Sequence, residues 1–534
     1  MVFGREEFIM KNGNDIILKE EIRECRKRGG RNPRASAGNR GRLLLTELII
    51  GTALSFCSAG CAPLSVDNTP EVTIPDSYEG FIPGEMNEKE LNEWWRLFND
   101  DYLSYLIEKA VISNTDIRTA RMRYGQALHE AGISEADLGP SAVLHGMGAG
   151  GRSDVESSGR RYDSTDSQAV LMTGLQASWE PDLFGEKQSK LDAARYRALA
   201  AQDAVNAVRT SVTALLARKY FEILYLRERK AVLNDGISNL KRLRSYAAGR
   251  FSAGQATMYD LTDIDAGITD MEAQLSVLDD ATASAVRAVA VLAGEPPQSF
   301  SPEKMPAGLP RNIPLPPAGA VPGELLLRRP DILSKRNEVN AAASMTAAAM
   351  ADLYPRFEIS FLGQLGRIEM HSRPDIDFGV GFITGSVSVP VFTNGRIRAR
   401  IEAENTSMKA ALAEYDGLIL KALKEVDDGY YGVMKLGERV EKLKKGRAEA
   451  EKLLADADKL FKYGMAEFDK KIEAGNRIIS FDEKICETEF NRIVRLIDLY
   501  KALGGGWDYP AGKEAGVHGA AEADEGKADY TFIR

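Results

Sequence analysis

The fold of this chain is decided by the stretch between DLFGEKQ (182–188) and RFSAGQA (250–256), whose glycines, Gly185 and Gly254, stand 69 residues apart. The residues between the two glycines have uninterrupted helical periodicity, with apolar side chains recurring as in a coiled-coil seam. Because an α-helix rises about 1.5 Å per residue, this stretch predicts a helix of roughly 100 Å. Ordinary soluble domains use much shorter helices.

A second copy of the same pattern follows. It begins at VFTNGRI (391–397) with Gly395 and ends at FKYGMAE (461–467) with Gly464, again 69 residues later. Each copy is preceded by two segments of strand-like alternation and followed by a second helical stretch. A repeat on this scale indicates an internal duplication.

The N-terminal region resembles that of an exported lipoprotein. The apolar run LLLTELIIGTALSF (43–56) has the length of a signal-peptide core and is too short for a membrane span. Small residues at 58–60 stand directly before Cys61, as in a bacterial lipobox, so we expect a covalent lipid on Cys61. The alternative is ordinary signal cleavage beside an incidental cysteine. Residues 1–42 have two interpretations: the translation start is placed too far upstream, or these residues form a cytoplasmic extension.

These patterns divide the chain into six segments. We expect a leader with a signal peptide at 1–60, a lipid-anchored linker at 61–92, the first repeat at 93–294, a Pro-rich linker at 295–330, the second repeat at 331–507 and a disordered tail at 508–534. Within the repeats we expect strand pairs at 141–181 and 356–392, long helices at 185–250 and 395–462, and return helices at 257–292 and 466–502.

Composition argues against two classes of function. The net charge of −9 gives no reason to expect nucleic-acid binding. The four histidines are scattered without metal-ligand spacing, and no phosphate-binding loop or nucleophile motif occurs, so we expect neither an enzyme nor a cofactor. Four strands per chain are too few for a membrane barrel, so closure requires other copies. Three chains supply twelve strands and two supply eight.

Seven motifs in order identify a family. They are WWRLFND (94–100), ASWEPDLFG (177–185), RFSAGQ (250–255), LAGEPP (292–297), ELLLRRPDI (324–332), VPVFTNGRIRA (389–399) and LYKALGGGW (499–507). With them, residues 61–507 resemble the TolC-type outer-membrane factors, in the lipoprotein branch that partners RND-type multidrug pumps. The resemblance implies a mainly helical homotrimer, lipid-anchored in the outer membrane, whose twelve-stranded β-barrel continues into a periplasmic α-helical barrel.

The resemblance also implies two kinds of functional residue. In the family both glycine turns lie at the periplasmic tip and meet the adaptor protein, which assigns tip contacts to Arg250, Phe251, Ala253, Gly254, Tyr463, Gly464 and Met465. The family closes its tip with carboxylates, which assigns a periplasmic gate to Glu473, Asp469, Lys470 and Asp260. The chain departs from the family here: Lys470 stands beside the acids, and Ala466 replaces an arginine that pairs with the acid at position 260.

The function that we expect is passive export of small molecules, such as drugs or other toxic compounds, from an inner-membrane RND-type pump through a periplasmic adaptor. Metal export and type I protein secretion use the same scaffold and stay open as alternatives. A periplasmic coiled-coil adaptor or structural lipoprotein is an alternative of another class, but it does not explain the duplicated strand segments.

Overall fold

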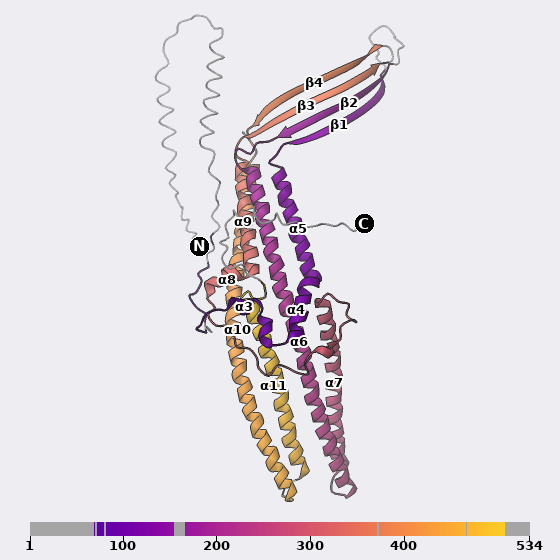
Figure 1. The fold of residues 1–534 in the computed structure, drawn as a ribbon, viewed down its shortest axis with the longest axis vertical. Coiled ribbons are helices and arrows are strands. Elements are labelled where there is room, and N and C mark those ends of the chain that lie inside the picture. The colour runs from indigo at the N-terminus through magenta and orange to yellow at the C-terminus, as the bar shows by residue number, and fades with distance from the viewer. Residues whose placement is uncertain are drawn as a thin grey trace, which may run out of the picture. The chain divides into compact units, whose positions relative to one another are not determined.

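The same order of helices and strands occurs twice in the chain (Figure 1). The computed structural model describes residues 69, 72–78, 82–153, 166–370, 373–465 and 467–507, which all belong to one unit. The first copy consists of α5 (Thr115–Ala136), β1 (Ser141–Ser153), β2 (Asp166–Trp179), α6 (Glu186–Ser252) and α7 (Met258–Leu292). The second consists of α9 (Pro330–Ala351), β3 (Arg356–Met370), β4 (Arg373–Ser388), α10 (Arg396–Lys462) and α11 (Phe468–Ala502).

The long helices α6 and α10 have 67 residues each and lie between the glycines that the sequence singled out. Gly185 and Gly395 precede them with φ of 77° and 79°, and Gly254 and Gly464 follow them with φ of 71° and 68°. Residues with a Cβ rarely adopt this left-handed conformation, so glycine sets both ends of each helix. None of the helices in the described ranges is long and apolar enough to cross a membrane.

The helices form a single layer. Next to the strands the order across the layer is α5, α6, α9 and α10, and toward the far ends it is α7, α6, α11 and α10 (Figure 1). α5 and α7 therefore succeed one another along one side of α6, and α9 and α11 succeed one another along its other side. Of the described helices, only α6 and α10 run the whole length of the layer.

Both places where one short helix succeeds another are built in the same way. Gly294, just after α7, has a φ of 76°, and a Cβ there would collide with the backbone of Ser113 at the end of α4 (Asp101–Ser113). Gly504, just after α11, has a φ of 73°, and its Cβ would lie 3.0 Å from the carbonyl oxygen of Arg328. Glycine thus allows the end of α7 to lie close to the residues just before α5, and the end of α11 to lie close to the residues just before α9.

The strands form one antiparallel sheet in the order β1-β2-β3-β4. Each copy contributes one pair, and the two copies meet where β2 pairs with β3 from Gln168↔Met370 to Trp179↔Ile359. Among the strands of the described residues, β1 and β4 each have a neighbour on one side only. Both edges of the sheet are therefore open.

A buried aromatic core surrounds the middle of the helical layer. It involves α3 (Glu88–Asn92), the 3₁₀ helix η2 (Trp94–Phe98) and the central parts of α6, α10 and α11. The indole of Trp94 stacks on the ring of Tyr500 at a centroid distance of 5.6 Å, and Phe98 lies 4.7 Å from Phe221. This core ties the segment before the first repeat to helices of both repeats.

Two predicted linkers contain short helices. α3 lies at the end of the 61–92 segment, and η3 (Pro302–Lys304) and α8 (Pro322–Arg328) lie within the Pro-rich 295–330 segment. α9 likewise starts at Pro330, one residue earlier than expected. Proline is compatible with the first turn of a helix, because its missing N–H has no partner there. The Pro-rich composition therefore marked helix starts as well as loops.

Candidate functional site

The turns that join α6 to α7 and α10 to α11 have the same backbone geometry. The amide of Gln255 donates to the carbonyl of Arg250 at 2.8 Å, and the amide of Met465 donates to the carbonyl of Leu460 at 2.8 Å. In both turns the glycine takes the left-handed conformation just before that closing bond, as in a Schellman motif. The two copies thus present equivalent backbone at the far ends of the long helices.

Most of the predicted tip contacts are accessible. Tyr463 and Met465 are 77% and 70% exposed, and Phe251 is 40% exposed. Ala253, Gly254 and Gly464 are also exposed, whereas Arg250 is half-buried. Exposed aromatic and thioether side chains beside a tight turn are typical of a protein-binding surface.

The two turns of one chain contact each other, and no local sequence pattern predicts this contact. The guanidinium of Arg250 donates to a carboxylate oxygen of Glu467 at 3.0 Å. Behind this ion pair, Tyr246 of the first hairpin packs on Phe468 and Phe461 of the second, with centroid distances of 4.4 Å and 6.0 Å. The hairpins are thus joined by a charged contact and an aromatic cluster.

The predicted gate acid Glu473 is surrounded by cations of its own helix. Its carboxylate accepts from Lys470 at 3.0 Å and from Arg477 at 3.0 Å. These hydrogen bonds, first that from Lys470 and then that from Arg477, lower the pKa of Glu473 below its usual range. Asp469 accepts a hydrogen bond from the backbone amide of Lys470 at 2.8 Å. The spacing of three and four residues on α11 explains both ion pairs.

The structure places the predicted gate residue Asp260 in a helix cap. Its carboxylate accepts from the amide and the hydroxyl of Thr257, at 2.8 Å and 2.9 Å, and completes a capping box at the start of α7. The same hydrogen bonds lower the pKa of Asp260. The side chain is thus engaged in its own helix, and the ion pair between the two turns is made by Arg250 and Glu467 instead. Ala466 lies outside the described residues.

Ion pairs of Asp458 also join α10 to α11 near the tip. Asp458 of α10 accepts from Lys462 at 2.8 Å and also pairs with Lys471 of α11. The two lysines, first Lys462 and then Lys471, lower the pKa of Asp458 to about 2. This carboxylate therefore stays ionised at any physiological pH.

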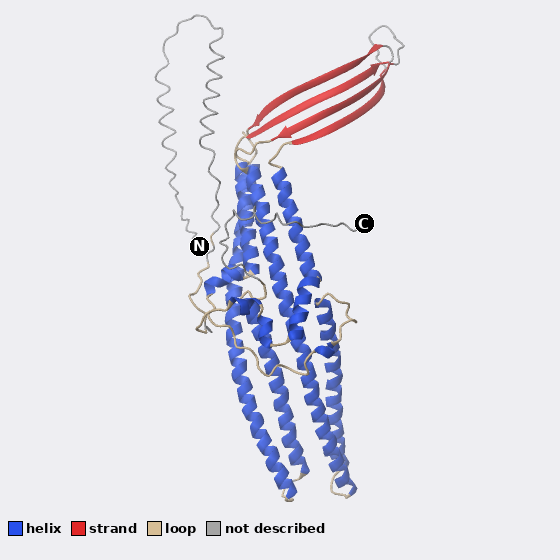
Figure 2. Cartoon of the chain, viewed as in Figure 1, coloured by secondary structure: helices blue, strands red, loops and turns tan. Residues whose placement is uncertain are grey.

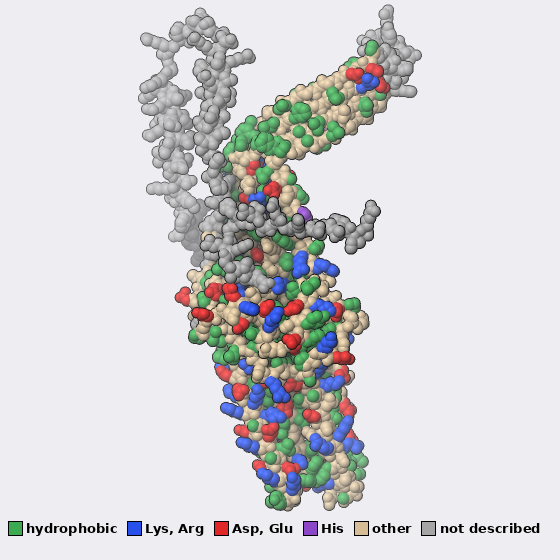
Figure 3. Space-filling view, in the orientation of Figure 1, with side chains coloured by type: hydrophobic (Ala, Val, Ile, Leu, Met, Phe, Trp, Pro, Cys, Tyr) green, Lys and Arg blue, Asp and Glu red, His purple; other side chains and the backbone are tan. Residues whose placement is uncertain are grey.

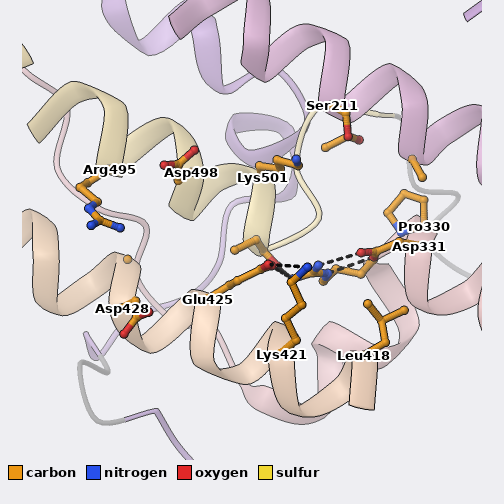
Figure 4. A pocket seen from close by; sticks show the side chains of 15 residues that line it. Ser211, Pro330, Asp331, Leu418, Lys421, Glu425, Asp428, Arg495, Asp498 and Lys501 are labelled. Atoms are coloured by element: carbon orange, nitrogen blue, oxygen red, sulfur yellow. Dashed lines mark hydrogen bonds and ion pairs between the residues drawn. The ribbon is translucent and has the colours of Figure 1, made fainter. Parts of the chain in front are cut away.

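A charged cleft of about 340 Å³ lies midway along the layer, between α6, the start of α9, α10 and α11 (Figure 4). In its wall, Arg329 donates to both carboxylate oxygens of Asp331, at 3.0 Å and 2.7 Å, and to Glu425 at 2.8 Å. It also reaches the carbonyl of Ala502 at 3.4 Å. Only 7% of the Arg329 side chain is exposed. The cleft is therefore built around the junction between α11 and α9.

The predicted lipidation site, Cys61, lies outside the described residues. Its role stays a prediction from the lipobox-like sequence before it.

Comparison with known proteins decides the family. A model described as "Outer membrane efflux protein" matches residues 106–295 and 321–505. The chain belongs to the outer membrane efflux protein family. The two matched blocks correspond closely to the two repeats, and the gap between them falls in the Pro-rich segment.

This efflux protein is similar to several curated proteins along most of their length. It is 24% identical over 469 residues to the pyoverdine export outer membrane protein OpmQ of Pseudomonas aeruginosa, covering 86% of this chain and 96% of OpmQ. It is 24% identical to the cation efflux system protein CusC of Escherichia coli K12, covering 85% and 99%. It is 27% identical to the solvent efflux pump outer membrane protein SrpC of Pseudomonas putida, covering 77% and 86%.

Solved structures show the same fold. The outer-membrane channel OprN aligns with a TM-score of 0.73 at 24% identity, covering 84% of this efflux protein and all of OprN. The open MtrE channel of Neisseria gonorrhoeae aligns with a TM-score of 0.71 at 23% identity, covering 83% and 98%. The predicted fold class is therefore confirmed: mainly helical, with membrane β-structure, as in the trimeric outer-membrane channels.

Family and fold together establish the coarse function. The chain is an outer-membrane efflux channel and not an enzyme, and channels of this family need no cofactor. It resides in the outer membrane and extends into the periplasm.

Proposed function

We propose that the chain is the outer-membrane component of a tripartite system, receiving small molecules from an inner-membrane RND-type pump through a periplasmic adaptor. One observation carries this proposal: a single chain joins an open four-stranded sheet to two 67-residue helices whose far ends are paired turns. The helices supply about 100 Å between the membrane and a partner. Drugs and other toxic compounds are the proposed cargo, and the pump selects among them.

Closure of the sheet supports a homotrimer. In hydrocarbon an unpaired strand edge is prohibitive, so β1 of one copy has to pair with β4 of the next. Three copies give twelve strands, an even number within the range of outer-membrane barrels. The free sides of the outermost helices also expose apolar side chains that a neighbouring copy would cover: Met122 and Ile133 on α5, and Tyr431, Met434 and Leu453 on α10.

The oligomer gives the direct test of this proposal. Unheated protein is expected to migrate in SDS as an oligomer of three times the chain's mass and to form conducting pores in planar bilayers. A chain that migrates as a monomer and does not conduct would contradict the proposal. Metal export remains the second candidate, supported by the similarity to CusC. Co-expression with a drug pump or with a cation pump and their adaptors distinguishes the two.

The duplicated turns are the proposed docking points for the adaptor. Gly254→Ala combined with Gly464→Ala is expected to strain each turn by about 1–2 kcal/mol, because alanine disfavours the left-handed conformation. A Cβ at either position meets no atom within 4 Å, so the effect is conformational and not steric. We expect weaker crosslinking to the adaptor and lower drug resistance with unchanged amounts of oligomer.

The matched control for this prediction is Gly249→Ala. Gly249 lies inside α6 near the same turn, and a Cβ there also meets no atom within 4 Å. This variant should retain both crosslinking and resistance. Unchanged crosslinking in the double variant at positions 254 and 464 would show that the turns are not where the adaptor binds.

Glu473 is proposed to line the conducting path at the tip, with its charge largely compensated by Lys470 and Arg477. Glu473→Gln is then expected to shift the selectivity of the pore toward anions, and Lys470→Gln to shift it by a similar amount toward cations. Because the pKa of Glu473 is lowered, wild-type selectivity should stay constant as the pH falls from about 8 to about 5. The measurement is the reversal potential under a KCl gradient. Unchanged values in both variants would show that Glu473 does not line the conducting path.

A further inference from the structure

The two faces of the sheet are not equally open. Leu171, Leu365 and Ile383 on one face are 68%, 65% and 75% exposed. On the other face the edge-strand residue Met147 is 54% exposed, but the residues of the central strands at 170, 172, 362, 364, 366 and 368, and Phe378 beside them, are half-buried. Curvature crowds side chains together on the concave side of a sheet, and Figure 2 shows the strands bowed along their length. The second face is therefore the concave one, and it becomes the lumen when the sheet closes into a barrel.

The convex face has the pattern of a lipid-facing surface. The register aligns Ala177, Phe361 and Ile383 across neighbouring strands, and further toward the loops the face carries Leu365. It ends in the ion pair of Arg367 with Asp377, at 2.7 Å and 3.1 Å. In Figure 3 charged side chains cover the helices, whereas on the visible side of the sheet they gather near its outer end. An apolar band bounded by charge matches the outer surface of a membrane barrel.

The concave face begins with polar side chains next to the helices. One row across the four strands consists entirely of hydroxyl-bearing residues: Ser141, Ser178, Ser360 and Thr384. The following rows contain Gln176, His145 and Gln364 among apolar neighbours. Nε2 of His145 lies 3.3 Å from Oε1 of Gln176. This part of the face suits a water-filled lumen.

Further out, two successive rows of the concave face lack any polar side chain. The first is formed by Met147, Met172, Gly366 and Phe378, and the second by Ala149, Val170, Ile368 and Ile376. We call these two rows the apolar rows. A Cβ on Gly366 would overlap the ring of Phe378 and lie 3.2 Å from Cγ of Met172. The ring therefore lies over the glycine and forms a continuous apolar surface with the thioether.

We propose that the apolar rows form a ring near the outer end of the lumen that binds the apolar surface of permeants in transit and slows small hydrated ions. This inference rests on the proposed trimeric channel. The interior of an outer-membrane barrel is ordinarily polar, because water fills it. An apolar pore lining disfavours hydrated ions. Aromatic rings and thioethers instead attract organic cations and aromatic solutes. The ring thus favours permeants with an aromatic or aliphatic surface.

The test uses the full-length oligomer in planar bilayers with tetraphenylphosphonium as the probe and tetramethylammonium, which lacks aromatic surface, as the reference cation. Wild-type channels should show current block by tetraphenylphosphonium at concentrations where tetramethylammonium passes freely. Met147→Gln combined with Met172→Gln keeps side-chain length while adding polar groups to the ring. We expect about tenfold weaker block and a larger KCl conductance in this variant.

The matched control is the reverse exchange on the same face, Gln176→Met, which lies between the hydroxyl row and the apolar rows. It should block at least as strongly as the wild type. All variants are first checked for the SDS-resistant oligomer, so that a loss of block is not a loss of folding. Equal block in the wild type and the double variant, or no block in a conducting wild type, overturns the inference. A protein that forms no conducting pore contradicts the proposed function and the inference with it.

Discussion

Replacing Arg329 with methionine is expected to destabilise the helical layer by about 2–4 kcal/mol, the largest stability effect that we predict for one substitution. Methionine retains the aliphatic stem but leaves Asp331 and Glu425 facing each other without their shared cation. Breaking a buried ion pair costs about 3–5 kcal/mol. The carboxylates are 39% and 38% exposed, so water offsets part of this cost.

The measurement is the thermal midpoint of the helical circular dichroism signal, with Lys424→Met as the control. Lys424 is 73% exposed and pairs with Asp428 on the same helix, α10, so its loss should change stability by less than about 0.5 kcal/mol. Similar midpoints for Arg329→Met and the control would show that the buried network does not stabilise the junction between α11 and α9.

The network should also resist mild acid. Burial raises the pKa of Asp331, but the hydrogen bonds to Arg329 outweigh this effect and hold the pKa below its ordinary value of 3.8. A depressed carboxyl pKa stabilises the fold above the unfolded-state pKa, and this stabilisation is lost as the pH falls through the lower folded-state value. The contribution of the network to wild-type stability should therefore be nearly constant between about pH 7 and pH 5. In Arg329→Met no cation opposes the effect of burial, so the pKa of Asp331 is raised, and its protonation should narrow the midpoint difference from the wild type as the pH falls.

Reversing the charge of Arg250 is expected to open the periplasmic tip. In Arg250→Glu the attractive contact with Glu467 becomes a repulsion, which near the tip is opposed by the aromatic cluster of Tyr246, Phe461 and Phe468. We expect a severalfold larger single-channel conductance than in the wild type. Planar bilayer recordings of the purified oligomer provide the measurement.

A charge exchange distinguishes a specific lock from a general effect of charge. Arg250→Glu combined with Glu467→Arg restores the attraction and should return the conductance toward the wild-type value. Lys459→Glu is the control, since Lys459 lies near the same tip, is 71% exposed and pairs with Asp456 of its own helix. If the double exchange conducts like Arg250→Glu alone, the ion pair is not a lock.

Features that depend on near neighbours in the sequence were predictable. Helical periodicity between paired glycines gave the long helices, because the left-handed turn that ends each of them requires glycine. Alternation gave the strands, since side chains of a strand point to opposite faces. The cations beside Glu473 were also predictable in part, because Lys470 and Arg477 stand three residues before it and four residues after it on one helix.

Features that join distant residues were not predictable in this way. The ion pair of Arg250 with Glu467 spans 217 positions, and the bond of Arg329 to Glu425 spans 96. Periodicity says which face of a helix is apolar, but not which partner that face meets. Asp260 differs in kind: its place in the family pattern assigned it to the gate, whereas in the structure a capping box with Thr257 engages its carboxylate.

The sequence by itself determined the two copies of a strand pair and a helix of about 100 Å with glycines at both ends, because these features depend on local periodicity and backbone conformation. Only the tertiary structure decided which side chains line the concave face of the sheet and which contacts join the two turns. The apolar rows exist because the strand register places Met147, Met172 and Phe378 in one row, and a one-residue shift of any of their strands would turn that strand's residue to the lipid. The contact between the turns exists because the layer brings the two hairpins together, and no local pattern encodes that proximity.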